Sequence, residues 1–216
     1  MKKAAWLIVI ISPLLALGAC QLPMFKSYEE PAYQRTKLVS EAPTIEYRLY
    51  PPKLMAEVAV SGARREAISD GFRLLADFIF GNNRAQSNID MTTPVAQQGI
   101  SEPIDMTAPV AQQASGDDTW HVRFYMPKAY TIDTLPKPNH EKVQIKVQPA
   151  YTAVVIRFSG SHSDSNLKKH QKQLDAYIAE QNLITMGGPT YAFYNPPWTP
   201  WFMKRNEIIY RLAPAS

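Results

Sequence analysis

The chain contains a long internal repeat, and this repeat restricts its possible folds more than any other feature of the sequence. Residues 50–62 and 148–160 align at an offset of 98 positions, with a proline near the start of each copy and Ser-Gly at its end. Valine-rich segments favour β-strands, and proline is tolerated where a strand begins. A helix-like stretch follows each copy. The sequence therefore predicts an α+β fold built from a duplicated β-α-β unit, with two helices on an antiparallel sheet or barrel.

Both stretches that follow the repeat have helical periodicity. The first is predicted as a helix over residues 64–80, because its apolar side chains recur at i, i+4, i+7 and i+11 and Gly81 follows them. The second is predicted as a helix over residues 166–181, with Ser165 or Asp164 as its N-terminal cap. The apolar stripes consist of Ile68, Phe72, Leu75 and Ile79 in the first helix and of Leu167, Leu174 and Ile178 in the second.

Several further segments have the character of strands. A short repeat with an offset of 15 residues covers residues 89–98 and 104–113, and Pro94 and Pro109 within it favour edge positions or bulges. Two other segments alternate between apolar and polar side chains, and a third lies near the C-terminal end and is predicted as the last strand. These predicted strands cover residues 120–126, 143–147 and 207–212.

The N-terminus has the pattern of an exported bacterial lipoprotein. Lys2 and Lys3 precede an apolar run over residues 4–17, which is shorter than the roughly 20 residues that span a bilayer. Small residues then lead to Cys20, the single cysteine, where lipid chains would anchor the protein to a membrane. Because Gln21 rather than Asp follows, we expect the periplasmic face of the outer membrane, with the inner membrane as the alternative. The predicted parts are a signal peptide over residues 1–19, a lipidated cysteine and tether over 20–40, and a ligand-binding domain over 41–213.

The positive charge does not predict a nucleic-acid partner. The net charge is +4, yet the basic residues are scattered along the chain and never form a run of more than two. A nucleic-acid interface usually gathers lysine and arginine into one stripe. The charge pattern is typical of a solvated, mildly basic surface.

No motif in the sequence predicts catalysis. The four histidines include no pair at the i, i+4 spacing of a helical metal site. His121 is the best candidate for a metal ligand among them, and a surface histidine is the alternative. The run of residues 161–164, Ser-His-Ser-Asp, contains the residue types of a nucleophilic triad, but neighbours in sequence seldom form one, and a helix-capping loop is the simpler interpretation. We therefore predict a protein that is not an enzyme.

The order of several short motifs resembles the SOUL heme-binding protein family over about residues 42 to 213. Each motif is weak alone, and together they are specific. The motifs are Glu46-x-Arg48-x-Tyr50, Met-Thr-x-Pro-Val at 91–95 and 106–110, Phe-x-Met-Pro at 124–127, Pro-x-Pro at 136–138, Arg-Phe-Ser-Gly at 157–160, Tyr-Asn-Pro-Pro at 194–197 and Arg-Asn-Glu-Ile at 205–208.

The resemblance implies a twisted antiparallel β-barrel flanked by two helices, and a surface groove for heme between the first helix and the loop over residues 195–204. Heme would be a ligand that folding does not require. The family's proposed iron-ligating histidine aligns with Leu49, which cannot ligate iron, and its propionate-binding positions align with Ser69, Asp77 and Thr199. Arg64, Arg65, Arg73, Arg84 or Lys204 are alternative partners for propionates. The candidate ligand-binding residues are Ile68, Phe72, Trp198, Trp201, Phe202, Lys204 and Arg205.

Three functions fit these observations. The first is non-catalytic, membrane-anchored binding of heme, another tetrapyrrole or another flat apolar ligand in the periplasm. The second is a small-molecule binding module like the effector domains of bacterial regulators, for which Glu207 would supply a buried carboxylate. The third is a structural or interaction lipoprotein of the envelope without heme, which predicts a filled groove and an exposed apolar patch.

Overall fold

The computed structural model describes residues 29–41, 43–99, 119–196 and 198–214. The predicted signal peptide, Cys20 and the second copy of the short repeat lie outside the described residues. No helix within the described ranges is long and apolar enough to cross a membrane.

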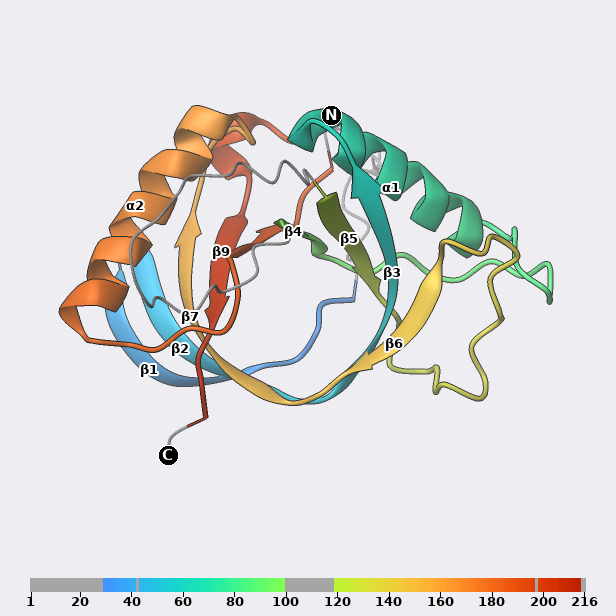
Figure 1. Ribbon diagram of the computed structural model, residues 1–216, viewed down its shortest axis with the longest axis horizontal. Helices are drawn as coiled ribbons and strands as arrows, with labels where there is room; N and C mark the ends of the chain where they lie inside the picture. Colours follow the sequence, from blue (N-terminus) through green and yellow to red (C-terminus); the bar gives the residue numbers. More distant parts are fainter. Residues whose placement is uncertain (1–28, 42, 100–118, 197, 215–216) are drawn as a thin grey trace, which may run out of the picture.

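The described part of the chain folds into one curled antiparallel sheet with two helices on its outer side (Figure 1). The nine strands are ordered β1-β2-β7-β9-β8-β4-β5-β3-β6, so β1 and β6 form the edges of a half-barrel. The strands are β1 (Gln34–Glu41), β2 (Thr44–Tyr50), β3 (Lys53–Ser61), β4 (Val95–Gly99), β5 (Thr119–Tyr125), β6 (Gln144–Gln148), β7 (Tyr151–Phe158), β8 (Thr190–Phe193) and β9 (Asn206–Arg211). The helices are α1 (Arg64–Ile79) and α2 (Asp164–Glu180), and a 3-10 turn, η2 (Trp201–Met203), precedes β9.

The strand order confirms the duplication. One half of the sheet runs β6-β3-β5-β4 and the other runs β2-β7-β9-β8, so each strand of one half has a counterpart in the other. The central strands of the halves, β3 and β7, begin at Lys53 and Tyr151 and lead into α1 and α2. The halves meet at the β4–β8 pair, from Val95↔Phe193 to Gln98↔Thr190. The predicted α+β fold with an antiparallel sheet and two flanking helices is thus confirmed, and the predicted barrel is a half-barrel.

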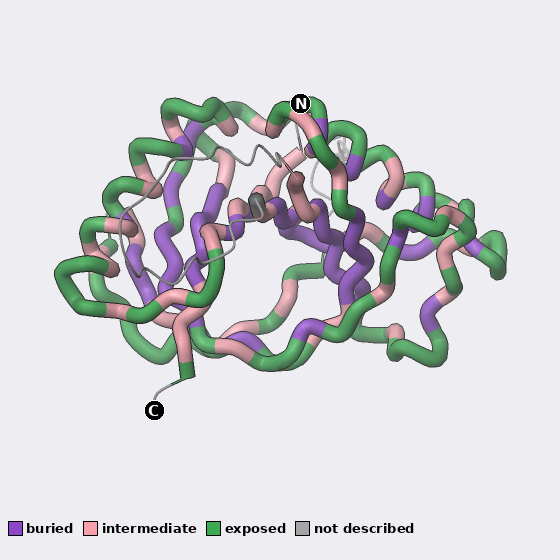
Figure 2. Tube along the Cα trace, viewed as in Figure 1, coloured by how far each residue is buried: buried purple, intermediate pink, exposed green. Residues whose placement is uncertain are grey.

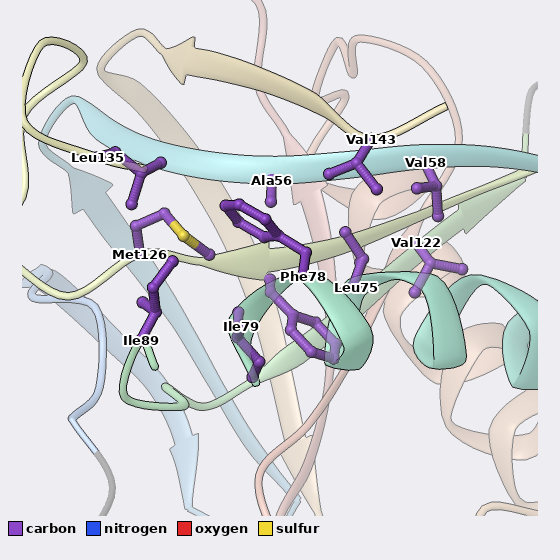
Figure 3. Packing of buried hydrophobic residues seen from close by; sticks show 11 residues of the cluster. Ala56, Val58, Leu75, Phe78, Ile79, Ile89, Val122, Met126, Leu135 and Val143 are labelled. Atoms are coloured by element: carbon purple, nitrogen blue, oxygen red, sulfur yellow. The ribbon is translucent and has the colours of Figure 1, made fainter. Parts of the chain in front are cut away.

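Each helix covers its own half of the outer face and closes a separate hydrophobic core. Leu75, Phe78 and Ile79 of α1 point onto Ala56 and Val122 of the sheet (Figure 3). Leu167 and Leu174 of α2 pack in the same way on β7 and β9. The helix surfaces that face away from the sheet are exposed, whereas the strands beneath are largely buried (Figure 2).

The apolar stripe predicted for α1 is partly wrong. Its buried residues are Ala67, Gly71, Leu75, Phe78 and Ile79, whereas Ile68 is half-buried and Phe72 is 39% exposed. The helix approaches the sheet so closely at Gly71 that an added Cβ would lie 2.6 Å from a methyl carbon of Val122. The contact face therefore includes small residues, which a pattern of large apolar side chains does not reveal.

Two predictions about boundaries also need correction. Residues 34–40, which the sequence placed in the tether, form most of β1, because the edge of β2 offers a backbone partner to this segment. The cap of α2 is Ser163 rather than Ser165 or Asp164, since its side chain accepts the N–H of Asn166. The sequence did not predict β1, β2 or β8 as strands.

Candidate ligand-binding cleft

A cleft opens between the N-terminal ends of the two helices, above the β4–β8 joint. Its volume is about 620 Å³, which lies within the range of small-molecule sites. The lining residues come from both halves of the duplicated fold: Arg64, Arg65 and Ile68 of α1, Gln97 of β4, His162, Ser163 and Asp164 at the start of α2, and Phe193 of β8. The cleft therefore lies on the approximate symmetry axis of the molecule.

The α1 end of the cleft is electropositive. Ala63 is the N-cap residue of α1 and supplies no side-chain hydrogen bond, so the first N–H groups of the helix lack a side-chain cap. Arg64 and Arg65 stand on this first turn. Arg64 reaches across the cleft to Asp164, with 2.5 Å between Nη1 and Oδ1. Arg65 and the uncapped start of α1 favour an anionic group at this end, where such a group would compete with Asp164 for Arg64.

The floor of the cleft carries a buried amide without a partner. Gln97 is only 1% exposed, and neither its side-chain oxygen nor its nitrogen has a hydrogen bond. An unsatisfied buried polar group costs about 1–3 kcal/mol, which a ligand or water with a matching polar atom recovers. Phe193 and Ile68 add apolar surface beside the amide. The cleft thus combines apolar walls, a polar floor and a cationic rim.

His162 is the histidine that lines this cleft, and its ring lies 4.3 Å from the ring of Phe193. Burial, followed by the positive charges of Lys204 and Arg64, lowers the pKa of His162 to about 4. The imidazole is therefore neutral at neutral pH and retains a nitrogen lone pair. The run of residues 161–164 also acts as the predicted helix-capping loop through Ser163.

The inner face of the sheet, opposite the helices, holds a buried network of charges around Glu207. Arg48 binds this carboxylate through two hydrogen bonds of 2.7 and 2.9 Å, and Arg205 adds bonds of 3.0 and 2.8 Å. Arg48 also bonds Glu46, and the hydroxyl of Tyr194 donates to Glu207 at 2.7 Å. Burial would raise the pKa of Glu207, but Arg48 and Arg205 lower it below its ordinary value. Glu207 is thus buried as predicted, yet its charge is already neutralised.

His121 also faces this inner side, away from the cleft. It lies 3.3 Å from the carboxylate of Glu57, which binds Arg123 at 2.5 Å and Lys146 at 2.6 Å as well. Burial would raise the pKa of Glu57, but His121, Lys146 and Arg123 lower it well below its ordinary value. Among the described residues, no group of three or more histidine, cysteine, aspartate or glutamate side chains is placed to hold a metal ion.

The structure does not gather all the predicted ligand-binding residues at one place. Ile68 lines the cleft, whereas Phe72 lies further along α1 against Phe124, at 5.2 Å between ring centroids. Lys204 and Arg205 line a neighbouring hollow on the β7 and α2 side, and Arg205 extends inward to Glu207.

The predicted aromatic loop stands out from the surface. Trp198, Trp201 and Phe202 are 73%, 66% and 60% exposed. They do not line the cleft, and they do not plug an end of the barrel. The backbone of Trp201 accepts a hydrogen bond from Gly160 at 3.1 Å, which holds this loop beside the start of α2.

The sequence did not single out Gln97, His162 or Phe193 as ligand-binding residues. Each is a common side chain in an unremarkable setting, and they come from segments separated by 65 and 31 positions along the sequence. The available signal was the duplication itself, since a twofold arrangement brings the two helix starts to one axis.

These features define an α+β ligand-binding domain whose half-barrel sheet consists of two similar halves. The family model of the SOUL heme-binding protein matches residues 28–211, and the chain belongs to this family. The family supports a role in ligand binding. No curated protein matches the chain significantly in sequence.

Solved structures with the same fold have low sequence identity. The C-terminal domain of EcmrR matches 84% of this chain and 98% of its own at 10% identity, with a TM-score of 0.59. An uncharacterized conserved protein from Listeria innocua matches 78% of this chain and 92% of its own at 12% identity, with a TM-score of 0.51. A hydrolase encoded by lin2189 from Listeria innocua matches 78% and 91% at 13% identity, with a TM-score of 0.50. At these identities the likeness concerns the fold alone.

Proposed function

We propose that the chain binds a tetrapyrrole such as heme, without catalysis, in the cleft between the helix starts. The observation that carries this proposal is the pairing of apolar and cationic surfaces in one cleft of about 620 Å³. A tetrapyrrole has a flat apolar ring with carboxylates on one edge. Ile68 and Phe193 suit the ring, while Arg64 and Arg65 at the uncapped start of α1 suit the carboxylates.

The residues present also fit a metal-containing tetrapyrrole. Neutral His162 is the imidazole of the cleft, and it is the side chain we expect to ligate iron in place of the family position occupied by Leu49. Bound heme would supply an iron with an open coordination position. The orphaned amide of Gln97 would hydrogen-bond a polar edge of the ligand.

The test is titration of the purified full chain with hemin, followed by the Soret absorbance. The double variant Arg64→Ala/Arg65→Ala and the variant Gln97→Leu should each weaken binding about tenfold or more, which corresponds to roughly 1.4 kcal/mol. The matched control is Trp198→Ala/Trp201→Ala, which removes apolar surface outside the cleft and should bind normally. Binding lost only in the control would move the site to the aromatic loop, and no saturable binding would refute the proposal.

The aromatic loop favours a second candidate function. Trp198, Trp201, Phe202 and Met203 form an exposed apolar group, which suits contact with a partner or a membrane surface. In that case the chain acts as an interaction lipoprotein, and the tryptophan control variant loses the contact while hemin binding is unaffected.

The proposed location is the periplasmic face of the outer membrane, through lipid on Cys20. This rests on the sequence pattern that ends at this cysteine. Radiolabelled palmitate should label the wild-type chain and not a Cys20→Ser variant, and membrane fractionation should recover the labelled protein with the outer membrane. Labelling that persists in the variant would refute the anchor.

A further inference from the structure

The inner face of the sheet carries a group of tyrosines around one lysine. The Nζ of Lys53 lies 4.1 Å from the ring centroid of Tyr125, 4.4 Å from that of Tyr50 and 5.6 Å from that of Tyr151. The rings of Tyr50 and Tyr151 stack at 4.8 Å, with 16° between their planes. We call Tyr50, Tyr125 and Tyr151 the tyrosine cage. A cation surrounded by aromatic faces at such distances is the arrangement by which proteins recognise quaternary ammonium groups.

The ammonium of Lys53 has no carboxylate to balance its charge. Within the described ranges, no carboxylate lies within ion-pair distance of Lys53. Glu207 raises the pKa of Lys53, but this carboxylate is already bound by Arg48 and Arg205. The aromatic faces are therefore the groups that hold this ammonium.

The lysine is an imperfect occupant of the cage. Burial, followed by the positive charge of Arg211, lowers the pKa of Lys53 to about 7, with Glu207 acting in the opposite direction. A lysine ammonium is compact and strongly hydrated, so its desolvation is costly. A quaternary ammonium is weakly hydrated, so its desolvation costs less, although it would still face the Arg211 guanidinium, which lies 4.5 Å from the ring centroid of Tyr151.

There is additional space beside the ammonium. Lys53 and Tyr125 line a small cavity of about 80 Å³. Its outer wall includes Glu29 and Pro31, from the segment that precedes β1. The Tyr33 ring covers the cage from the same segment, at 5.6 Å from the ring of Tyr50. The space and the segment that covers it suit a small occupant rather than a large one.

We propose that the tyrosine cage is a binding site for a small quaternary ammonium ion, and that Lys53 occupies it as a built-in ligand. The cage lies on the opposite face of the sheet from the cleft. This inference therefore does not depend on the proposed tetrapyrrole function.

The test measures binding of tetramethylammonium chloride to the full chain by calorimetry and thermal unfolding, with sodium chloride at equal concentration as the salt control. Lys53→Ala empties the cage and should bind tetramethylammonium saturably, at least tenfold more tightly than the wild type. Lys53→Met, which fills the space without a charge, should bind no better than the wild type. The double variant Lys53→Ala/Tyr125→Leu, which removes one wall, should lose the binding.

A folded Lys53→Ala variant that shows no binding, or that binds as well after loss of Tyr125, overturns the proposal. If the alanine variant does not fold, the wild type decides by NMR. The ε-methylene protons of Lys53 should resonate upfield of the other lysines because of the ring currents, and excess tetramethylammonium should shift them back. An ordinary resonance position, or one unaffected by the added cation, also overturns the proposal.

Discussion

Removal of Arg48 should be far more harmful than removal of the whole ion pair to which it belongs. Arg48 and Glu207 are both 0% exposed, and they form two hydrogen bonds of 2.7 and 2.9 Å. Breaking a buried pair by deleting one partner leaves an uncompensated charge, which typically costs about 3–5 kcal/mol. Replacing both partners by apolar side chains of similar size is often close to neutral.

The neighbours of the pair set the expected magnitude. After Arg48→Met, Glu207 keeps Arg205 and Tyr194, and Glu46 keeps its contact with Arg35. We therefore expect a loss near the lower limit, about 3 kcal/mol, or roughly two powers of ten in the folding equilibrium. For a domain of this size the midpoint of thermal unfolding should fall by about 6–12 °C. The double variant Arg48→Met/Glu207→Leu should recover more than about 1 kcal/mol of that loss.

The assay is urea unfolding followed by circular dichroism for the wild type, both single variants and the double variant. The double-mutant cycle then gives the coupling free energy between the two residues. A double variant as unstable as the sum of the single variants would refute the reasoning. A loss below about 1 kcal/mol for Arg48→Met would also refute it, because a surface pair gives a value of that size.

Three further measurements test the packing and the cleft. Gly71→Ala should lower the free energy of unfolding by about 1–3 kcal/mol in urea titrations, since the new methyl group meets Val122 at 2.6 Å; an unchanged value would contradict the close approach of α1. Leu174→Ala should lower the free energy of unfolding by about 2–5 kcal/mol in the same assay, because this side chain of α2 faces the sheet and is 0% exposed. A loss below about 1 kcal/mol would show that the core under α2 is loosely packed. The ring protons of His162 should titrate near pH 4 by NMR rather than near 6.5. Because the pKa is lower in the folded than in the unfolded state, this group's contribution to stability is complete above pH 6.5 and is lost as the pH falls through 4. A midpoint near 6.5 would place the ring in solvent.

The fold was largely predictable because the sequence contains it twice. The repeat at residues 50–62 and 148–160 identified β3 and β7 together with the helices that follow them, and the antiparallel sheet followed from the pairing of such units. The face of α1 was less predictable. Ala67 and Gly71 are buried on this face, and Gly71 lies close to Val122, but a pattern of large apolar side chains does not mark small residues as contact points.

The inner face shows how a motif can be visible while its role is not. Glu46, Arg48 and Tyr50 carried the family resemblance, and their i, i+2, i+4 spacing on β2 directs all three to one side of the sheet. Their partner Glu207 lies 159 positions from Arg48, so the neutralised carboxylate could not be inferred from local pattern. The same separation in sequence hid the cleft, whose walls belong to four different elements and loops.

Within the described sheet, the two halves are joined by the short β4–β8 pair. The two halves share the four residue pairs from Val95↔Phe193 to Gln98↔Thr190, and each half has its own core under its own helix. A small rotation of one half against the other would change the gap between the helix starts, and it would also move Lys53 and Tyr125 relative to Tyr50 and Tyr151 on the inner face. The Arg64–Asp164 ion pair connects the two helix starts across that gap. A ligand whose anionic group competes for Arg64 would therefore also weaken this connection between the halves. Ligand binding in the cleft would then be coupled to the angle between the two halves.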